Sequence, residues 1–284
     1  MGIGPECDKA HCGRVAQRKG IHQGDSYRQR DNHADRAVTD LSDKVVLVTG
    51  SSRGLGKGMA CGLARHGASV VVHYLQNREA AEQTGEEISK IGREPLIVQA
   101  DVRQWQQVQS LIDKVIRFYG RIDVMVNNVG AFLQSSLADL DIESWHNLLD
   151  SNLNSAFYCC KAVLPYMREQ KWGRIINIAV ANADRIHAYQ RITAYAIAKT
   201  AVLILTRSFA VEEAKSGITV NAISPGFMDN GGISEQEKTR QSLMVPQKRL
   251  GTVDDLLPVI CALIDDRSRY VTGSNTVVSG GWGL

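Results

Sequence analysis

From Leu41 onward, short apolar runs alternate with longer amphipathic segments, and this alternation restricts the possible folds more than any other feature. Several of the runs are apolar at consecutive positions, which is typical of strands covered by helices on both faces. Strands that alternate with helices predict βαβ units and a parallel sheet. The predicted strands cover residues 45–49, 69–73, 95–100, 122–127, 174–179, 218–223 and 276–278.

The segments between these strands show helical periodicity. In 105–119 the apolar residues recur at a spacing that gives one buried face. Two longer helices are predicted over about 142–170 and 193–216. Glycines that could adopt a left-handed conformation stand between helices and strands at Gly67, Gly92, Gly120, Gly173 and Gly217. We therefore predict an α/β fold with a doubly wound seven-stranded parallel sheet (Rossmann-like), in a single domain over 41–284.

Residues 1–40 have a different character, because acidic and basic side chains are mixed there without an apolar pattern. We expect a poorly ordered polar extension, and its acidic residues argue against an organellar presequence. A net charge of +3 without a Lys/Arg block argues against nucleic acid as a partner. No run of about 18 apolar residues is evident, so we expect no membrane association.

The six cysteines are scattered along the chain, which favours reduced thiols in a cytoplasmic protein. Cys7 and Cys12 lie near His11 and His22, but their spacing matches no ordinary zinc site. We therefore expect no metal.

A glycine-rich segment at 49–56, TGSSRGLG, joins the first predicted strand to a helix. Glycines allow the backbone to turn tightly and to approach a pyrophosphate, and the helix N-terminus offers free N–H groups to an anion. A structural turn would explain three glycines alone, but their place at the first strand–helix junction favours a dinucleotide site. The predicted contacts are Gly50, Ser52, Arg53, Gly54, Leu55 and Gly56.

The end of the second predicted strand bears on cofactor choice. NAD-binding enzymes usually have a carboxylate there for the ribose 2′-hydroxyl, whereas this chain has Tyr74 and no acid before Glu79. Arg53, together with Arg78, could pair with a 2′-phosphate, although both arginines could instead be merely solvated. We favour NADP(H) over NAD(H), with Tyr74 among the cofactor contacts.

Tyr195 and Lys199 are four residues apart in a predicted helix, which places both side chains on one face. A phenol with a pKa near 10 is a poor acid or base at neutral pH, and a neighbouring ammonium lowers that pKa. This pair usually means an ordinary helix surface, so its significance depends on the motifs around it.

Those motifs occur in a fixed order along the chain. After the glycine segment come Asp101-Val102, then Asn127-Asn128-Val129-Gly130, Asn152, the Tyr195/Lys199 pair and Pro225-Gly226. This series resembles the short-chain dehydrogenase/reductase family over about 41–284, and the overall chain is similar to 3-oxoacyl-carrier-protein reductases.

The resemblance implies roles for these residues. Tyr195 would be the general acid that protonates the substrate oxygen, Lys199 would lower its pKa and hold the nicotinamide ribose, and Asn152 would anchor a relay water. Members are commonly homotetramers. The residues expected to bind the cofactor are Asp101 and Val102 at the adenine, Asn128 and Gly130 near the adjacent ribose, Pro225 and Gly226 at the nicotinamide, and Tyr195 and Lys199. The apolar helix face expected between subunits, part of which core packing would also explain, comprises Phe157, Cys160, Val202, Leu203, Thr206 and Phe209.

The chain departs from the family at its catalytic serine. Alignment from the strand start places Val180 there, whereas counting thirteen residues back from Tyr195 gives Asn182. Neither is a serine, and the loss of one such donor costs about 10²–10³ in rate. Asn182 or Asp184 could replace it, and pteridine reductases of this family use an aspartate near that position. The stretch that follows Gly232, up to Arg249, is expected to form a mobile lid over the substrate.

These observations favour an NADPH-dependent reductase acting on a ketone, a 3-oxoacyl thioester or a pterin-like C=N bond. The alternative is a cofactor-binding but catalytically impaired member that acts as a redox-sensing regulator or a structural subunit. Val180 supports this alternative, whereas Asn152, Tyr195 and Lys199 oppose it. A scaffold without cofactor is a third possibility.

Overall fold

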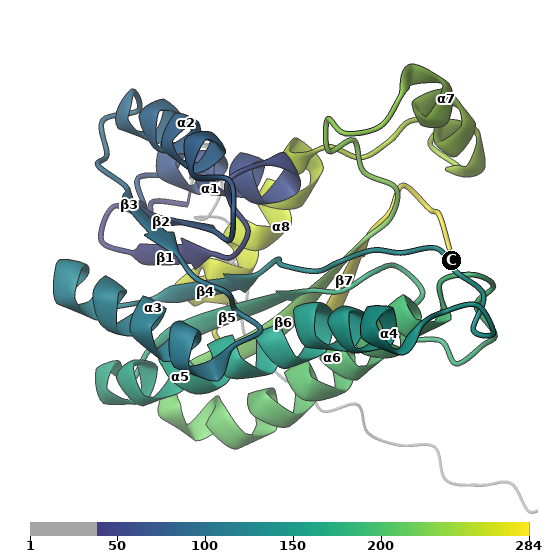
Figure 1. The fold of residues 1–284 in the computed structure, drawn as a ribbon. Helices are drawn as coiled ribbons and strands as arrows, with labels where there is room; N and C mark the ends of the chain where they lie inside the picture. The colour runs from purple at the N-terminus through teal and green to yellow at the C-terminus, as the bar shows by residue number, and fades with distance from the viewer. Residues whose placement is uncertain (1–38, 284) are drawn as a thin grey trace, which may run out of the picture. The chain divides into compact units, whose positions relative to one another are not determined.

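The computed structural model describes residues 39–283, which lie within one compact unit, Val38–Leu284. As predicted, seven parallel strands form one sheet, and their order is β3-β2-β1-β4-β5-β6-β7 (Figure 1). The strands are β1 (Val45–Val48), β2 (Ser69–Tyr74), β3 (Leu96–Gln99), β4 (Val124–Asn127), β5 (Gly173–Ile178), β6 (Ile218–Pro225) and β7 (Asn275–Val278).

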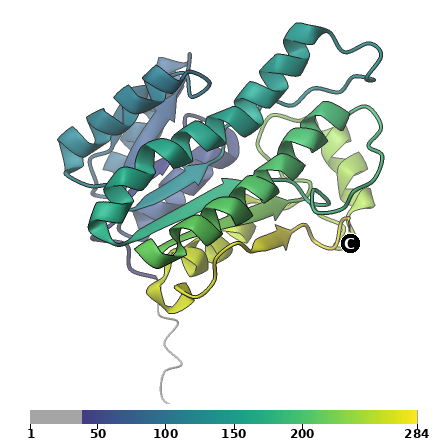
Figure 2. The same ribbon diagram turned by 90° about the horizontal axis from the view of Figure 1, so that it is seen from below.

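Helices cover both faces of the sheet, and Figure 2 shows this layering from below. One layer contains α1 (Gly54–Arg65), α2 (Arg78–Ser89) and α8 (Val253–Ile264). The other contains α3 (Trp105–Tyr119), α5 (Ser155–Gln170) and α6 (Thr193–Glu213). Alternate residues of β1 face opposite layers, since Val46 packs in the first core and Leu47 in the second. Consecutive apolar residues in β1 are therefore buried on both faces.

The order of the strands in the sheet determines where the site lies. The chain runs from β1 outward to β3 and then returns to place β4 on the other side of β1. In open parallel sheets this reversal leaves a crevice beyond the carboxyl ends of the two central strands, where ligands bind. The segments that follow β1 and β4 carry the glycine-rich segment and Asn128-Val129-Gly130.

Two local predictions differ from the structure. The helix predicted over 142–170 consists of α4 (Ile142–Leu149), a π-helical turn (Asp150–Asn154) and α5. Gly173, predicted to end a helix, begins β5 instead, and Lys171 adopts the left-handed conformation with φ 53°. A Cβ at Gly173 would lie 2.5 Å from Met167 Sδ, so this glycine provides space and not a turn.

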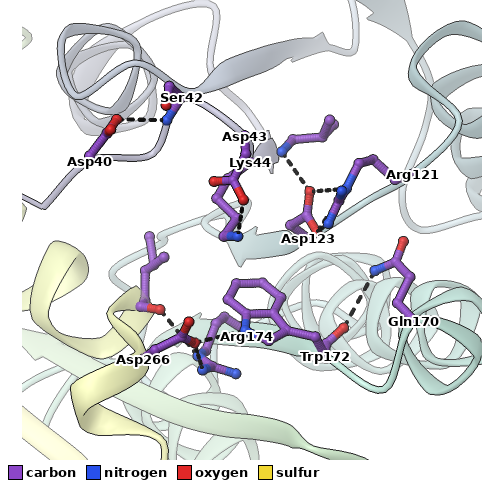
Figure 3. A network of polar contacts seen from close by, with 12 residues as sticks. Asp40, Ser42, Asp43, Lys44, Arg121, Asp123, Gln170, Trp172, Arg174 and Asp266 are labelled. Atoms are coloured by element: carbon purple, nitrogen blue, oxygen red, sulfur yellow. Dashed lines mark hydrogen bonds and ion pairs between the residues drawn. The ribbon is translucent and has the colours of Figure 1, made fainter.

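The amino ends of the strands are joined by a polar network on the edge opposite the site (Figure 3). The buried Asp123 carboxylate accepts the N–H of Val45 at 2.8 Å and pairs with Arg121 at 2.6 Å. Arg174, which is 2% exposed, donates to the C-terminal carbonyl of α8 at Ile264 and pairs with Asp266 at 2.8 Å. Burial lowers the pKa of Arg174. These bonds attach the end of α8 to β5.

The predicted subunit-contact face on α5 and α6 is largely part of the core, and that expectation was wrong in detail. Cys160, Val202, Leu203, Thr206 and Phe209 are all buried against the sheet or its neighbours. A helix that packs on a sheet needs the same apolar periodicity as a helix that packs on another subunit, so the pattern did not distinguish the two.

One segment of residues 39–283, Thr193–Ser216, is long and apolar enough to cross a membrane by length and composition alone. The apolar runs of this segment are interrupted by polar residues, so the segment does not stand out in the sequence as a spanning stretch. Its mean hydropathy is 1.4, and 44% of that window is buried. This segment contains α6, whose buried face packs against β6, and that packing accounts for its composition.

Candidate active site

A cavity of about 450 Å³ lies at the reversal point between β1 and β4. It is formed by the segments that follow β1, β2, β3 and β4, together with α4 and Asn230. The predicted cofactor residues that line it are Gly50, Arg53, Gly54, Leu55, Gly56, Asp101, Val102, Asn128 and Gly130. The other predicted cofactor residues lie outside this lining: Ser52, Tyr74, Tyr195, Lys199, Pro225 and Gly226.

The glycine segment after β1 is shaped by close contact between its own turns. Gly50 and Gly54 have φ angles of 65° and 57°, which side-chain-bearing residues rarely adopt. A Cβ at Gly56 would lie 2.2 Å from the Gly50 carbonyl oxygen. The N-cap residue Arg53 makes no side-chain capping bond, and the first turn of α1 has no acidic residue. The N-terminus of α1 therefore offers uncapped N–H groups toward the cavity, which suits a pyrophosphate.

His73 holds this segment against β2. Its Nδ1 accepts the N–H of Gly50 at 2.9 Å, so the proton lies on Nε2, which donates to the Ala100 carbonyl at 2.9 Å. Burial lowers the pKa of His73 to about 4, and the ring is neutral. The Ser51 hydroxyl accepts the backbone N–H of His73 at 2.9 Å. Sequence reasoning did not identify this positioning role, although a histidine at the end of a buried strand was the available signal.

Asn128 braces the same segment from β4. Its side-chain amide donates to the Thr49 carbonyl at 2.9 Å, and its backbone N–H donates to the Thr49 hydroxyl at 2.9 Å. The side-chain amide therefore shapes the loop, although the residue also lines the cavity.

Tyr74 does not reach the cavity, because its side chain is buried in the core layer of α1, α2 and α8. Its neighbours His73 and Leu75 line the cavity. Arg53 is exposed and has no ion pair with any residue of 39–283. Arg78 pairs with Glu82 at 2.7 Å, and does not line the cavity either. Arg53 is thus the cation available at this end of the glycine segment.

Tyr195 and Lys199 share a face of α6, as the spacing predicts. The Lys199 amine lies 5.7 Å from the Tyr195 ring centroid and donates to the Ile178 carbonyl at 2.7 Å. Phe132 packs edge-on against Tyr195, with centroids 5.1 Å apart.

The electrostatics of this pair differ from the expectation. Burial raises the pKa of Tyr195 to about 12, and burial lowers the pKa of Lys199 to about 8. Burial is the cause of the raised pKa of Tyr195, and the nearby Lys199 amine, which donates to the Ile178 carbonyl, does not offset it. Tyr195 is therefore a neutral phenol at pH 7.

Asn152 lies in the π-helical turn between α4 and α5. Its amide nitrogen donates to the carbonyls of Ala131 at 2.8 Å and Leu148 at 3.0 Å. Its Oδ1 is buried and has no hydrogen-bond partner within residues 39–283. A Cβ at Gly130 would lie 2.3 Å from Asn152 Oδ1 and 3.3 Å from Lys199 Nζ. Asn152 and Lys199 therefore approach each other beside a glycine that lines the cavity.

The segment after β5 shows where the missing serine would stand. Val180 is half-buried in an apolar cluster with Ala183 and Leu203. Asn182 has a left-handed backbone with φ 72°, and a Cβ at Gly283 would lie 2.4 Å from its amide nitrogen. The Asn182 Oδ1 is buried without a partner in the described chain, whereas Asp184 is exposed.

The end of β6 and the residue after it are hydrogen-bonded to the segment after β5 and to β7. The Pro225 carbonyl accepts the N–H of Ala181 at 2.9 Å, and Gly226 donates to Val278 at 2.9 Å. The predicted lid contains α7 (Glu235–Met244), none of whose residues is buried. Asp229 pairs with Lys238 at 3.0 Å.

Among residues 39–283, no group of three or more His, Cys, Asp or Glu side chains is placed to hold a metal. The cysteines and histidines considered near the N-terminus, and the predicted extension itself, lie almost wholly outside the described residues.

Comparisons with known proteins cover this whole site. A model of the family described as enoyl-(acyl carrier protein) reductase matches residues 50–283. The 3-oxoacyl-[acyl-carrier-protein] reductase FabG of Staphylococcus epidermidis is 34% identical over 247 residues, covering 84% of this chain and 98% of its own. The corresponding reductase of Synechocystis sp. is 37% identical over 245 residues, covering 86% and 98%.

Two solved structures of proteins named as putative dehydrogenases resemble this chain in fold and in sequence. A putative short-chain alcohol dehydrogenase from Sinorhizobium meliloti superposes with a TM-score of 0.80 at 31% identity, over 86% of this chain and 98% of its own. A putative gluconate dehydrogenase from Agrobacterium tumefaciens gives a TM-score of 0.79 at 31% identity, over 86% and 97%.

The buried amine of Lys199 predicts a pH-dependent contribution to stability. Its pKa of about 8 lies below the ordinary value of 10.5, so between these pH values the unfolded chain binds more protons than the native one. The free energy of unfolding gained from this group therefore rises with pH. We expect the stability of the wild type, relative to Lys199→Met, to rise by about 2–3 kcal/mol from pH 7 to pH 10.5.

Urea unfolding at several pH values measures this difference. Exchange of the exposed Lys114 for Met serves as the matched control. If the difference in the free energy of unfolding between the wild type and Lys199→Met stays constant with pH, burial does not destabilise the charged form of Lys199.

Proposed function

Because the chain belongs to the short-chain dehydrogenase/reductase family, we propose that this NAD(P)-dependent oxidoreductase uses NADPH to reduce a carbonyl, either a ketone or a 3-oxoacyl thioester. The observation that carries the proposal is the convergence of Asn152 and Lys199 beside Gly130, at the cavity wall, with Tyr195 one turn away on α6. Two relatives named 3-oxoacyl-[acyl-carrier-protein] reductases favour the thioester.

The cavity suits a dinucleotide, which supplies hydride from its nicotinamide when bound. The uncapped N-terminus of α1 and the tight turn at Gly56 would hold the pyrophosphate. Lys199 would bind the nicotinamide ribose, and Asp101 and Val102 would lie at the adenine end.

Tyr195 is the proton donor in this proposal. Its raised pKa keeps the phenol protonated at neutral pH, which is the form that a reductase needs to protonate the substrate oxygen. Asn152 Oδ1 and Lys199 Nζ stand at the start of a proton path, since both approach the same gap at Gly130. Asn182 and Asp184 remain candidates to donate the hydrogen bond that the family's serine would make to the substrate. If the substrate has a pterin-like ring, the exposed Asp184 would be its contact. We place the enzyme in the cytoplasm, with no nucleic acid or membrane partner.

Exchange of Tyr195 for Phe removes the proton donor and leaves the ring that packs on Phe132. We expect carbonyl-dependent NADPH oxidation to fall by about 10²–10⁴-fold, while NADPH binding stays within a factor of about two of wild type. A panel of ketones, 3-oxoacyl thioesters and pterins, with NADPH and NADH side by side, provides the measurement. NADPH binding without turnover on any panel member would favour the impaired-regulator alternative.

Exchange of Arg53 for Ala tests the choice of NADP(H). If Arg53 pairs with the 2′-phosphate, the variant should bind NADPH about tenfold more weakly, as expected for a lost charge-assisted hydrogen bond, and bind NADH unchanged. Titration of both nucleotides by fluorescence measures the ratio. Arg78→Ala is the matched control, because Arg78 is paired with Glu82 and lies off the cavity. Equal weakening for both nucleotides would contradict the assignment.

We also infer that the enzyme is a homo-oligomer, commonly a tetramer in this family, and that its subunits meet on the outward face of α6. Ile197, Ile204 and Val211 follow one another at intervals of seven residues there and are 45%, 61% and 81% exposed. A row of exposed apolar side chains on one helix suits a second copy of the same helix across a two-fold axis.

Ile204→Lys would place a charge in the middle of this row. We expect the wild type to elute as an oligomer and the variant to shift to a smaller species in gel filtration with light scattering. Lys substitution of the exposed Phe118 on α3 is the control. A monomeric wild type would contradict the inference.

A further inference from the structure

Arg103 is a cation in the cofactor cavity that the sequence motifs do not account for. It follows Asp101-Val102 after β3, and its side chain is 36% exposed. Within residues 39–283, it and Arg53 are the two positively charged residues in the cavity lining, since His73 is neutral. Unlike Arg53, it is fixed by several hydrogen bonds.

The side-chain hydrogen bonds of Arg103 lie along the edge of its planar guanidinium group. Nε donates to Asp101 Oδ1 at 2.9 Å, Nη2 donates to Asp101 Oδ2 at 2.8 Å, and Nη1 donates to Asn147 Oδ1 at 2.8 Å. The backbone N–H of Arg103 also donates to Asp101 Oδ1 at 3.0 Å. Hydrogen bonds of guanidinium lie in its plane. What Arg103 can offer to the cavity is therefore its planar face and its remaining N–H groups.

Asn147 connects this group to α4. Its backbone carbonyl accepts the Ser151 hydroxyl at 2.6 Å, and that hydroxyl accepts the N–H of Ala131 at 3.1 Å. The guanidinium is thus held between the end of β3 on one side and α4 on the other. A side chain fixed at both ends loses little further freedom when a ligand binds against it.

The sheet order determines which part of a dinucleotide meets Arg103. Tyr195, Lys199 and Gly130 define the hydride end, on the side of β4 and β5. Arg103 follows β3, which lies on the other side of β1 at the edge of the sheet. A dinucleotide whose pyrophosphate rests on the N-terminus of α1 would place its adenosine toward β3.

We propose that the face of the Arg103 guanidinium, held by Asp101 and Asn147, stacks on the adenine ring and makes Arg103 a determinant of dinucleotide affinity. The inference rests on the proposed nicotinamide cofactor. Stacking of a guanidinium on an aromatic ring contributes through its plane as well as its charge. This contact is to adenine, which NADPH and NADH share, so it differs from the 2′-phosphate contact assigned to Arg53.

The test is equilibrium binding of four probes to the full-length protein: NADPH, NADH, ADP-ribose and reduced nicotinamide mononucleotide, which lacks adenosine. Arg103→Ala should raise the Kd of the three adenine-containing probes by a common factor of about ten and leave the mononucleotide unchanged. Arg103→Lys should show the same loss, since lysine keeps the charge but not the planar fork. Asn147→Ala should show a smaller loss, because the pair with Asp101 remains.

Arg117→Ala, an exposed cation on α3, is the matched control, and thermal melting of each variant reports on folding. Unchanged Kd values in Arg103→Ala would overturn the inference, and so would restoration by lysine. A loss for NADPH alone would assign Arg103 to the 2′-phosphate, whereas a loss for the mononucleotide would show general damage to the site; either result overturns it. If the wild type binds no dinucleotide, the proposed function itself fails.

Discussion

The approach of Gly56 to the Gly50 carbonyl is the contact on which the rest of the site depends. A Cβ at position 56 would lie 2.2 Å from that oxygen, well inside the van der Waals contact distance, so only glycine allows α1 to begin this close to β1. Three hydrogen-bonding groups keep the turn in place: neutral His73 from β2, the Thr49 hydroxyl and the Asn128 amide from β4. These groups form hydrogen bonds with the backbone of the loop, and none of them caps α1. The N-terminus of the helix therefore remains available to an anion.

Burial controls the chemistry at the other end of the cavity. Tyr195 and Lys199 are both driven toward their neutral forms, since the environment beside β5 destabilises charge. A neutral phenol suits proton donation to a developing alkoxide. A lysine whose pKa is near 8 changes its charge readily, and the Ile178 carbonyl keeps its amine on the side of β5. A protonated Tyr195 is consistent with the proton-donor role that we propose for it.

Local patterns made the fold and the order of motifs predictable from the sequence, because burial on both faces and helix periodicity leave few alternatives. Patterns could not determine which side of an element a residue faces. Tyr74 and His73 are adjacent at the end of β2, and the sequence did not show that His73 braces the glycine segment while Tyr74 enters the core. The same limit affected Val202 and Phe209, whose apolar spacing fits a subunit contact and a sheet contact equally well. The sequence did not single out Arg103, because one hydrogen bond that fixes its guanidinium comes from Asn147, which lies far along the chain.

The segment after β5 is where the chain departs from its relatives, and its structure bears on the cost of that departure. Val180 supplies no hydrogen bond, and its side chain packs in an apolar cluster. Two residues later, Asn182 holds a left-handed backbone, which asparagine tolerates better than most residues, with a buried side-chain oxygen that no described residue satisfies. A strained residue with an unsatisfied polar group is typical of a functional position more than of a filler loop. Asn182 is therefore the residue of this segment that best suits the hydrogen bond we propose in place of the serine's, which favours a changed substrate contact over a site that has lost its chemistry.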